Sequence, residues 1–259
     1  MTPIYFGTGP RRLFGLYEVA RTGKAHRAVV LCQPWGQEYL RAHRSIRRLA
    51  NMLVATGWDT LRFDYFGTGD SAGDMTEADI AGWESDIESA IEEARDSSGV
   101  TRVALIGLRL GGSLAARVAA RRKDVDALVM WDPVVRGQDF LDDVRALETA
   151  VLSAPPSVRD DANGGGHEIL GFPLTSSMAA QIRSIDLPGV ADALPNRTLT
   201  LVSRTTGSHG DLIAALARQP THPLAVELIS SLPAWLEDRH TGAGAMPVNA
   251  LQRVTEWLA

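Results

Sequence analysis

Short apolar runs typical of β-strands alternate along the chain with segments of helical periodicity. The predicted strands are LFGLYEVA, RAVVLCQ, DTLRFDY, RVALIGL, DALVMWD, RTLTLVS and LAVELIS, and the later ones are apolar throughout. Apolar residues recur at positions i, i+3, i+4 and i+7 in four segments, which predicts helices over residues 40–55, 78–95, 112–121 and 248–258. This alternation predicts an α/β fold in which helices cover both faces of a mostly parallel, twisted sheet.

One connection is much longer than the others. About sixty residues separate DALVMWD from RTLTLVS, whereas connections between elements have a median length of roughly 4–6 residues. The segment holds PPS, NGGGHE, a linker-like stretch at 153–166 and a pattern that predicts a helix over 174–183. We therefore expect a single domain over residues 1–259 that carries a cap or lid insertion over residues 136–196.

Composition narrows the classes of function. The 259 residues are 45% hydrophobic with a net charge of −5, which suits one large α/β core and argues against nucleic acid as the main partner. No apolar run reaches the roughly 18 residues of a membrane span and the N-terminus lacks a signal-peptide pattern, so we expect a cytoplasmic protein. The sequence leaves open whether the tryptophans at 131, 235 and 257 pack inside or line a homodimer face.

Neither a metal nor a cofactor is expected. Cys32 is the single cysteine, which excludes an internal disulfide and a cysteine-based zinc cluster. The Gly-x-Gly patterns at 67–69 and 242–244 lack the strand, third glycine and helix of a dinucleotide site.

The segment VALIGLRLGGSLAARVAA predicts a buried strand, a sharp turn and a helix. α/β-Hydrolases present their nucleophile on such a turn, and Gly107 and Gly111 frame it because a Cβ would clash there. The central residue is Arg109 where a serine is usual. An arginine cannot attack a carbonyl, because its guanidinium stays protonated and offers only donors. Arg109 is therefore a candidate to bind a carboxylate, a phosphate or a developing oxyanion.

Four runs carry a resemblance to a known family: LIGLRLGGSLA, MWDPVVRGQDFL, LRFDYFGTGDSAGD and LCQPWGQEYLRAHR. They resemble the exosortase A system-associated hydrolase type 2 family, a serine-aminopeptidase-like branch of the α/β-hydrolases, over most of the chain up to about residue 187. The resemblance implies the α/β-hydrolase fold and an elbow in which relatives also carry arginine, as at Arg109. Asp132 departs from the glutamine of that family, and the "hydrolase" of its name rests on fold.

The chain order of the superfamily, nucleophile then acid then histidine, places the other catalytic candidates. Asp211 follows RTLTLVS and His240 follows LAVELIS, so Asp211 is the candidate acid and His240 the candidate general base. His209, beside the acid, competes with His240. The alternatives are structural: Asp211 as the N-cap of the helix IAALARQ, and His240 as a surface residue of a glycine-rich loop.

The oxyanion hole of this fold takes one N–H from the residue after the elbow and another from the loop after an early strand. Leu110 supplies the first. Trp35 or Gly36 supplies the second, because Pro34 has no N–H.

Two carboxylates lie on loops that converge with the elbow. Glu38 or Asp132 could pair with Arg109 and turn the elbow into a buried ion pair. Glu38 has an alternative role as an acidic residue at the start of the following helix. Cys32 ends a buried strand, and we expect it to be a small core residue rather than a reactive thiol.

A literal G-x-S-x-G motif occurs at residues 69–73, but it does not have the context of an elbow. The residues FGTG separate Ser71 from the strand LRFDY, and the next helix begins only after DMTE. We expect Ser71 to stabilise a turn. Ser113, on the first turn after the elbow, is expected to pack against the sheet.

Two classes of function remain. The first is an enzyme, a hydrolase or acyltransferase with Arg109 in place of the serine. Its substrate would be an acyl- or ester-type small molecule, which could be anionic. The alternative is a catalytically inactive pseudo-hydrolase that serves as a binding or scaffolding protein. We favour the enzyme because the insertion and the elbow would enclose a pocket of the usual ligand-binding kind. Fold does not prove function, and the sequence names no substrate.

Overall fold

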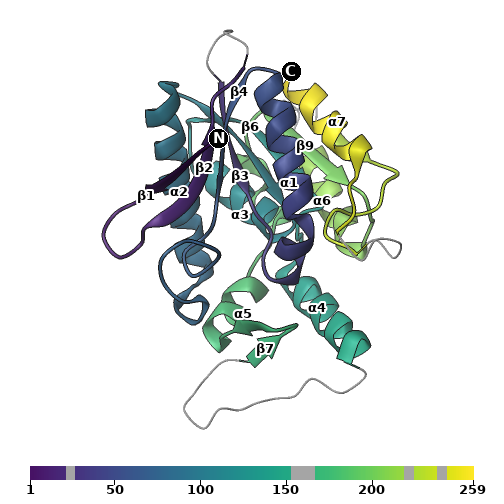
Figure 1. Cartoon of the computed structure of the whole chain (residues 1–259). Helices are drawn as coiled ribbons and strands as arrows, with labels where there is room; N and C mark the ends of the chain where they lie inside the picture. The colour runs from purple at the N-terminus through teal and green to yellow at the C-terminus, as the bar shows by residue number, and fades with distance from the viewer. Residues whose placement is uncertain (22–26, 153–166, 219–224, 238–243) are drawn as a thin grey trace.

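The computed structural model describes residues 1–21, 27–152, 167–218, 225–237 and 244–259. An eight-stranded sheet of order β1-β2-β4-β3-β5-β6-β9-β10 forms its centre (Figure 1). The strands are β1 (Thr2–Phe6), β2 (Leu13–Glu18), β3 (Arg27–Cys32), β4 (Trp58–Phe63), β5 (Val103–Leu108), β6 (Val125–Trp131), β9 (Arg197–Val202) and β10 (Ala225–Leu228). β2 pairs antiparallel with β1 and β4, and the remaining neighbours pair parallel. The predicted mostly parallel sheet is confirmed.

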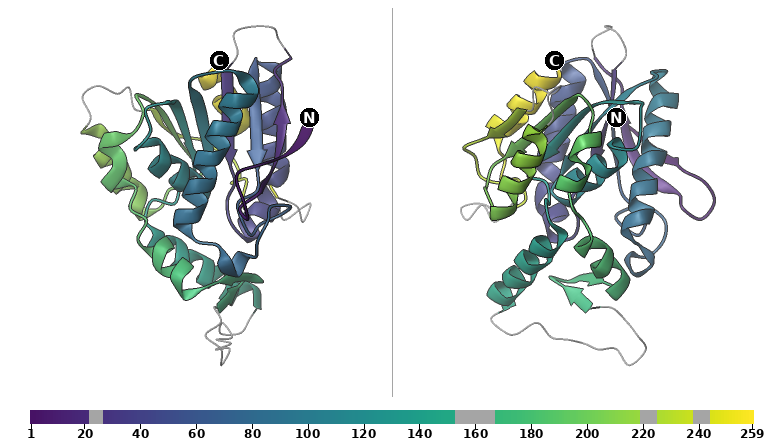
Figure 2. Two further views of the ribbon diagram at one scale, coloured as in Figure 1. Left: turned by 90° about the vertical axis from the view of Figure 1, so that its left-hand side faces the viewer. Right: turned by 180° about the vertical axis from the view of Figure 1, so that it is seen from behind.

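Helices cover both faces of this sheet, as predicted. α1 (Gln37–Ala55) and α7 (Val248–Leu258) pack on one face, and α2 (Ile80–Ser98), α3 (Leu110–Ala119) and α6 (Gly207–Ala217) pack on the other (Figure 2). α1 begins three residues before the prediction because its first turn is polar and adds nothing to the apolar pattern. None of the helices in the described part of the chain is long and apolar enough to cross a lipid bilayer.

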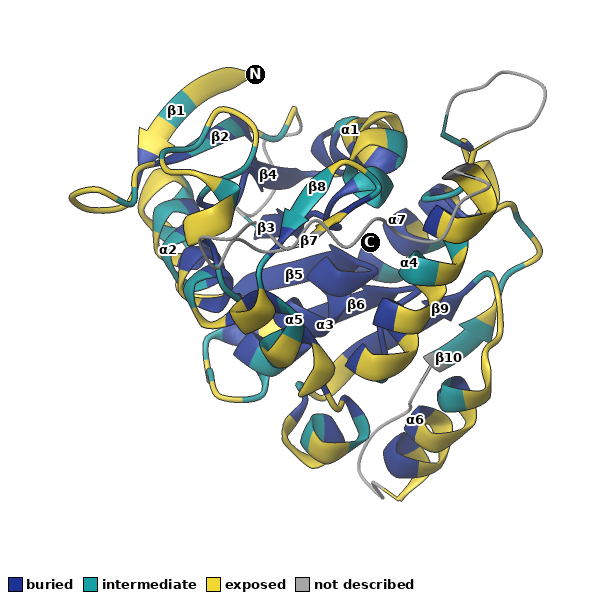
Figure 3. Ribbon diagram, turned by 90° about the horizontal axis from the view of Figure 1, so that it is seen from below, coloured by how far each residue is buried: buried dark blue, intermediate teal, exposed yellow. Residues whose placement is uncertain are grey.

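The segment between β6 and β9 leaves the sheet at the carboxyl end of the parallel strands. It contains α4 (Gly137–Leu152), the hairpin of β7 (His167–Ile169) and β8 (Phe172–Leu174), α5 (Ser176–Arg183) and a 3₁₀ helix (Pro188–Ala193). Figures 1 and 3 show α4, α5 and the hairpin gathered at this end of the molecule. The predicted helix over 174–183 begins later, because Thr175 caps α5 by accepting a hydrogen bond from the Met178 N–H. The stretch 153–166 lies outside the described residues.

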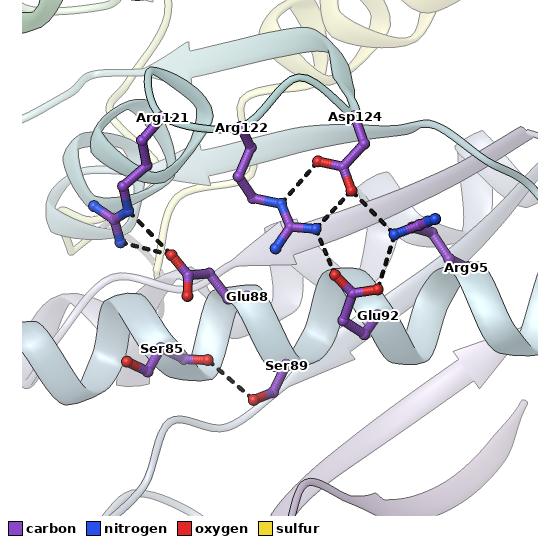
Figure 4. Close-up of polar contacts among 8 residues, drawn as sticks. All are labelled: Ser85, Glu88, Ser89, Glu92, Arg95, Arg121, Arg122 and Asp124. Carbon is purple, nitrogen blue, oxygen red and sulfur yellow. Dashed lines mark hydrogen bonds and ion pairs between the residues drawn. The ribbon is translucent and has the colours of Figure 1, made fainter.

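Ion pairs fix α2 beside the turn that joins α3 to β6. Arg122 pairs with both Glu92 and Asp124, and Arg95 bridges the same two carboxylates (Figure 4). The groups are partly exposed, so each pair contributes little by itself. Together they connect α2 to the far end of α3, the helix that begins at the candidate site.

Candidate functional site

Arg109 by itself forms the turn between β5 and α3. Its backbone has φ 53° and ψ −123°, a conformation that residues with a side chain rarely adopt. A Cβ at Gly107 would lie 2.3 Å from the Gly111 carbonyl oxygen, and one at Gly111 would lie 2.2 Å from the Gln33 carbonyl oxygen. Only glycine fits at these two positions, so the sequence of the turn and its geometry agree.

The Arg109 side chain is held in a buried polar contact. Its Nε donates to Glu38 Oε1 at 2.8 Å, and Nη1 lies 3.4 Å from the Asp132 carbonyl oxygen. The guanidinium carbon lies 4.0 Å from the ring centroid of Trp235 and 5.6 Å from that of Phe140. The Arg109 and Glu38 side chains are 8% and 12% exposed, so this is a shielded ion pair whose guanidinium also contacts two aromatic rings.

Burial raises the pKa of the Glu38 carboxyl, and the nearby charge of Arg109 opposes that effect. Oε1 is bonded to Arg109, whereas Oε2 is buried with no hydrogen-bond partner among the described residues. The carboxylate is therefore only half satisfied in this structure. Its charged form depends on Arg109.

Asp132 connects the ends of β6 and β9. It also has a positive φ, 44°, and its carboxylate accepts hydrogen bonds from the Ser203 N–H at 2.6 Å, from the Ser203 hydroxyl and from Trp235 Nε1 at 3.3 Å. Its carboxylate is thus used within the protein. Of the two carboxylates that the sequence suggested as partners of Arg109, Glu38 is the one that pairs with its side chain.

His209 lies at the start of α6 with its ring held by the N-cap residue. The Thr206 N–H donates to His209 Nδ1 at 3.0 Å, so the neutral ring carries its proton on Nε2. Nε2 is buried without a hydrogen-bond partner in the described part of the chain. Burial lowers the pKa of His209, the charge of Arg109 lowers it further, and Asp132 acts in the opposite direction. The ring is therefore held neutral as an Nε2–H donor.

Two pockets meet at Arg109. A polar pocket of about 310 Å³ lies between the elbow, α4 and the start of α6, and His209 lines it together with Arg109. A smaller, mostly apolar pocket of about 50 Å³ is lined by Arg109, by residues of the β7–β8 hairpin and by Trp235. Asp143 on α4 lines both pockets. The segment between β6 and β9 thus supplies one wall of each.

Of the predicted catalytic residues, Asp211 is not brought together with Arg109. Asp211 lies inside α6, exposed, and its carboxylate accepts from Arg136 Nη2 at 3.1 Å. Its predicted role as N-cap is wrong, because Thr206 occupies that position and α6 begins four residues before Asp211. His240 lies outside the described residues.

The predicted oxyanion-hole residues lie near the elbow. Leu110 is the first residue of α3, so its N–H has no partner within the helix. The loop of Trp35 and Gly36 follows β3, and Gln33 of that loop lies against Gly111 on the first turn of α3. Gly36 has φ 65° and precedes α1, which carries Glu38 in its first turn.

The other nucleophile candidates have structural roles, as expected. The Ser71 hydroxyl donates to the Asp64 carbonyl at 2.6 Å and accepts from the Phe14 N–H. The Ser113 hydroxyl donates to the Val134 carbonyl at 2.7 Å. Cys32 is buried, and burial raises the pKa of its thiol.

Sequence reasoning did not assign Phe140, Trp235, Ser203 and Thr206 to the site. Phe140 belongs to α4, whose apolar residues at 140, 144 and 147 have helical spacing, so a signal for that helix was present. No local signal marks Trp235 or Ser203, because their contacts with Arg109 and Asp132 join residues far apart in the chain.

The strand order, the helices on both faces and the sharp turn after β5 define an α/β-hydrolase fold. The family model described as serine aminopeptidase, S33, matches residues 23–165, more than half of the chain, and the chain belongs to this family. No curated protein matches the sequence.

Solved structures agree on the fold. Est1E from Butyrivibrio proteoclasticus with bound ferulic acid has 16% identity and a TM-score of 0.67, with 98% of this chain and 95% of that chain covered. The Pyrococcus furiosus esterase Pf2001 has 13% identity and a TM-score of 0.69, covering 99% and 89%. Proline iminopeptidase from Mycobacterium smegmatis has 12% identity and a TM-score of 0.66, covering 99% and 97%. The fold is that of esterases and peptidases of this superfamily.

Proposed function

We propose that this chain binds an acyl- or ester-type small molecule at Arg109 and hydrolyses or transfers its acyl group without a serine nucleophile at the elbow. Two hydrogen-bond donors at one pocket support this proposal. The Arg109 guanidinium and the His209 Nε2–H both belong to side chains that line the 310 Å³ pocket. Two donors that line one pocket suit a carbonyl oxygen that gains negative charge as it is attacked.

The state of His209 supports a role as donor rather than as base. Nδ1 is occupied by the Thr206 N–H, and the lowered pKa keeps the ring neutral near pH 7, so Nε2 has a proton to share and no free lone pair. Since Arg109 cannot attack a carbonyl, the attacking group in this proposal is a water molecule or the hydroxyl of an acceptor.

The segment over residues 136–196 acts as the cap in this proposal. α4 contributes Phe140 to the Arg109 contact and lines the polar pocket with Asp139, Asp142 and Asp143. These carboxylates disfavour anionic groups along that wall. An anionic part of the ligand therefore belongs at the Arg109 end, and the remainder of the molecule is neutral.

A second function has an observation of its own. Glu38 already occupies Arg109 Nε, and the Asp132 carboxylate is occupied by Ser203 and Trp235. Such internal pairing favours the alternative of a pseudo-hydrolase that binds a ligand without turnover.

Hydrolysis of p-nitrophenyl acetate, followed by absorbance, tests the proposal. We expect turnover above the buffer rate, and a decrease of roughly 10²-fold in His209→Asn and in Arg109→Leu, the size found when one oxyanion donor is removed. Asparagine keeps an acceptor near the position of Nδ1 and removes Nε2, so the contact with Thr206 is retained. His43→Asn is the matched control, because His43 is exposed on α1.

A fluorophosphonate probe separates this proposal from serine chemistry. The native protein should remain unlabelled, because such probes need an activated hydroxyl. Stoichiometric labelling at Ser71 or Ser113 contradicts the proposal. Turnover at the buffer rate in the native protein favours the pseudo-hydrolase.

A further inference from the structure

A third cavity shares Trp35, Gly36 and Phe172 with the small pocket at Arg109 but is not lined by Arg109 itself. Its volume is about 200 Å³, and its walls come from the loop after β3, the start of α1, the loop after β4 and the β7–β8 hairpin. Its surface is mostly apolar. The rings that line it are those of Trp35, Tyr39, Tyr65, Trp83 and Phe172.

Three buried polar atoms of the lining side chains lack partners among the described residues, namely Gln33 Oε1, Trp35 Nε1 and the Tyr65 hydroxyl. Gln33 Oε1 is an acceptor and Trp35 Nε1 a donor, and neither makes a hydrogen bond within the described residues. Gln33 is 7% exposed and Trp35 is 5% exposed. An unpaired buried donor or acceptor costs on the order of 1–3 kcal/mol, so three of them beside one cavity indicate that something else satisfies them.

The charges around the cavity limit what that can be. Among the described residues that line it there is no Lys, Arg or His, so an anion would find no counter-charge. Asp64 is the single carboxylate among the described lining residues. Tyr39 donates to its Oδ1 at 2.9 Å and the Asp70 N–H to its Oδ2 at 3.1 Å, so each oxygen is already engaged. Burial raises the pKa of Asp64, and the hydrogen bonds from Asp70 and Tyr39 oppose that effect.

We infer that this cavity is a second binding site, for an uncharged aromatic or apolar group that carries a carboxamide or a similar donor–acceptor pair. The carbonyl oxygen of such a group accepts from Trp35 Nε1, its N–H donates to Gln33 Oε1, and its ring packs among the aromatic side chains. The inference goes beyond the function proposed for Arg109 and does not depend on catalysis.

A series of three ligands of one size tests the charge and polarity of the site. Benzamide, benzoate and benzylamine are titrated into the ¹⁵N-labelled full chain, and the indole N–H signal of Trp35 is followed by NMR after assignment with Trp35→Phe. We expect benzamide to shift that signal and to bind at least tenfold more tightly than the other two. Equal or tighter binding of benzoate or benzylamine overturns the inference, as does the lack of a shift with 20 mM benzamide.

Variants locate the ligand. Gln33→Leu keeps the size of the side chain and removes the acceptor, so the Kd of benzamide should rise at least fivefold, while Gln252→Leu on the exposed face of α7 should leave it unchanged. If Gln33→Leu does not fold, Met75→Phe, which narrows the cavity, should weaken binding of benzamide by a similar factor. Unchanged affinity in both variants overturns the inference.

Arg109→Leu distinguishes the two sites, because Trp35 also lines the small pocket at Arg109. Affinity for benzamide should be the same in this variant. If Arg109→Leu loses affinity for benzamide while Met75→Phe keeps it, benzamide binds at the elbow. That result rejects the second site but does not affect the function proposed for Arg109.

Discussion

Replacing Glu38 by glutamine should strongly destabilise the protein. The Arg109 and Glu38 side chains are 8% and 12% exposed, and the bond between them is 2.8 Å long. Without the carboxylate, a guanidinium that cannot lose its proton remains in a poorly solvated place. Breaking such a pair from one side costs about 3–5 kcal/mol. For a chain of this size roughly 2–4 °C of Tm correspond to 1 kcal/mol, so Glu38→Gln should lower Tm by roughly 6–20 °C.

The opposite substitution should cost less. Arg109→Leu leaves Glu38 with a pKa that burial already raises, so the carboxyl can take up a proton and become neutral. The leucine can also pack against Trp235 and Phe140, which now contact the guanidinium. The double variant Glu38→Gln with Arg109→Leu should therefore be more stable than Glu38→Gln by itself.

Urea unfolding of the four proteins, read as a double-mutant cycle, measures the coupling between the two residues. Asp142→Asn is the matched control, because its pair with Arg145 is exposed and should contribute about 0–1 kcal/mol. If Glu38→Gln and Asp142→Asn lower the free energy of unfolding equally, the buried ion pair does not hold Arg109, and the reasoning is refuted.

Three further predictions concern the elbow and His209. Arg109→Ser should hydrolyse activated esters faster than Arg109→Leu does, and this difference should be lost again when His240→Ala is added, if His240 has its place in the superfamily. The pKa of His209 is lowered in the folded protein, so between that value and the unfolded value of about 6.5 the unfolded chain binds more protons. The free energy of unfolding should therefore fall as pH decreases through this window, by up to about 1.4 kcal/mol per pH unit. His209→Asn should remove that contribution. Gly107→Ala should destabilise by roughly 1–3 kcal/mol or more, because its Cβ would meet the Gly111 carbonyl at 2.3 Å.

Each of these has a control and a contrary outcome. Equal ester hydrolysis by Arg109→Ser with and without His240→Ala would mean that no working base remains. For the pH effect, chemical unfolding at pH 5.5 and 7.5 is compared in the native protein, His209→Asn and His43→Asn; a slope that persists in His209→Asn assigns it to other groups. For Gly107→Ala the comparison is Gly210→Ala, where a Cβ meets nothing within 4 Å, and equal Tm values would contradict the steric argument.

The sequence alone determined the order of the elements and the nature of the turn at residue 109. Apolar periodicity is a local property of the chain, so the seven predicted strands and five predicted helices, including the one over 174–183, correspond to elements of the structure. Gly107 and Gly111 likewise act through local backbone contacts. β1 was not predicted, because it is a mostly exposed edge strand with little apolar pattern. α4 was also not predicted, although its spacing contained the signal.

Only the tertiary structure decided which polar groups of the site pair with one another. Glu38 and Asp132 were equal candidates for Arg109 in the sequence, and the choice depends on Ser203 and Trp235, which occupy the Asp132 carboxylate from other loops. These contacts join segments up to about a hundred residues apart, and no local pattern encodes which polar groups meet once the sheet has formed. The same is true of His209: its position in the chain made it a candidate, but its neutral, donor-presenting ring follows from burial and from the Thr206 N–H.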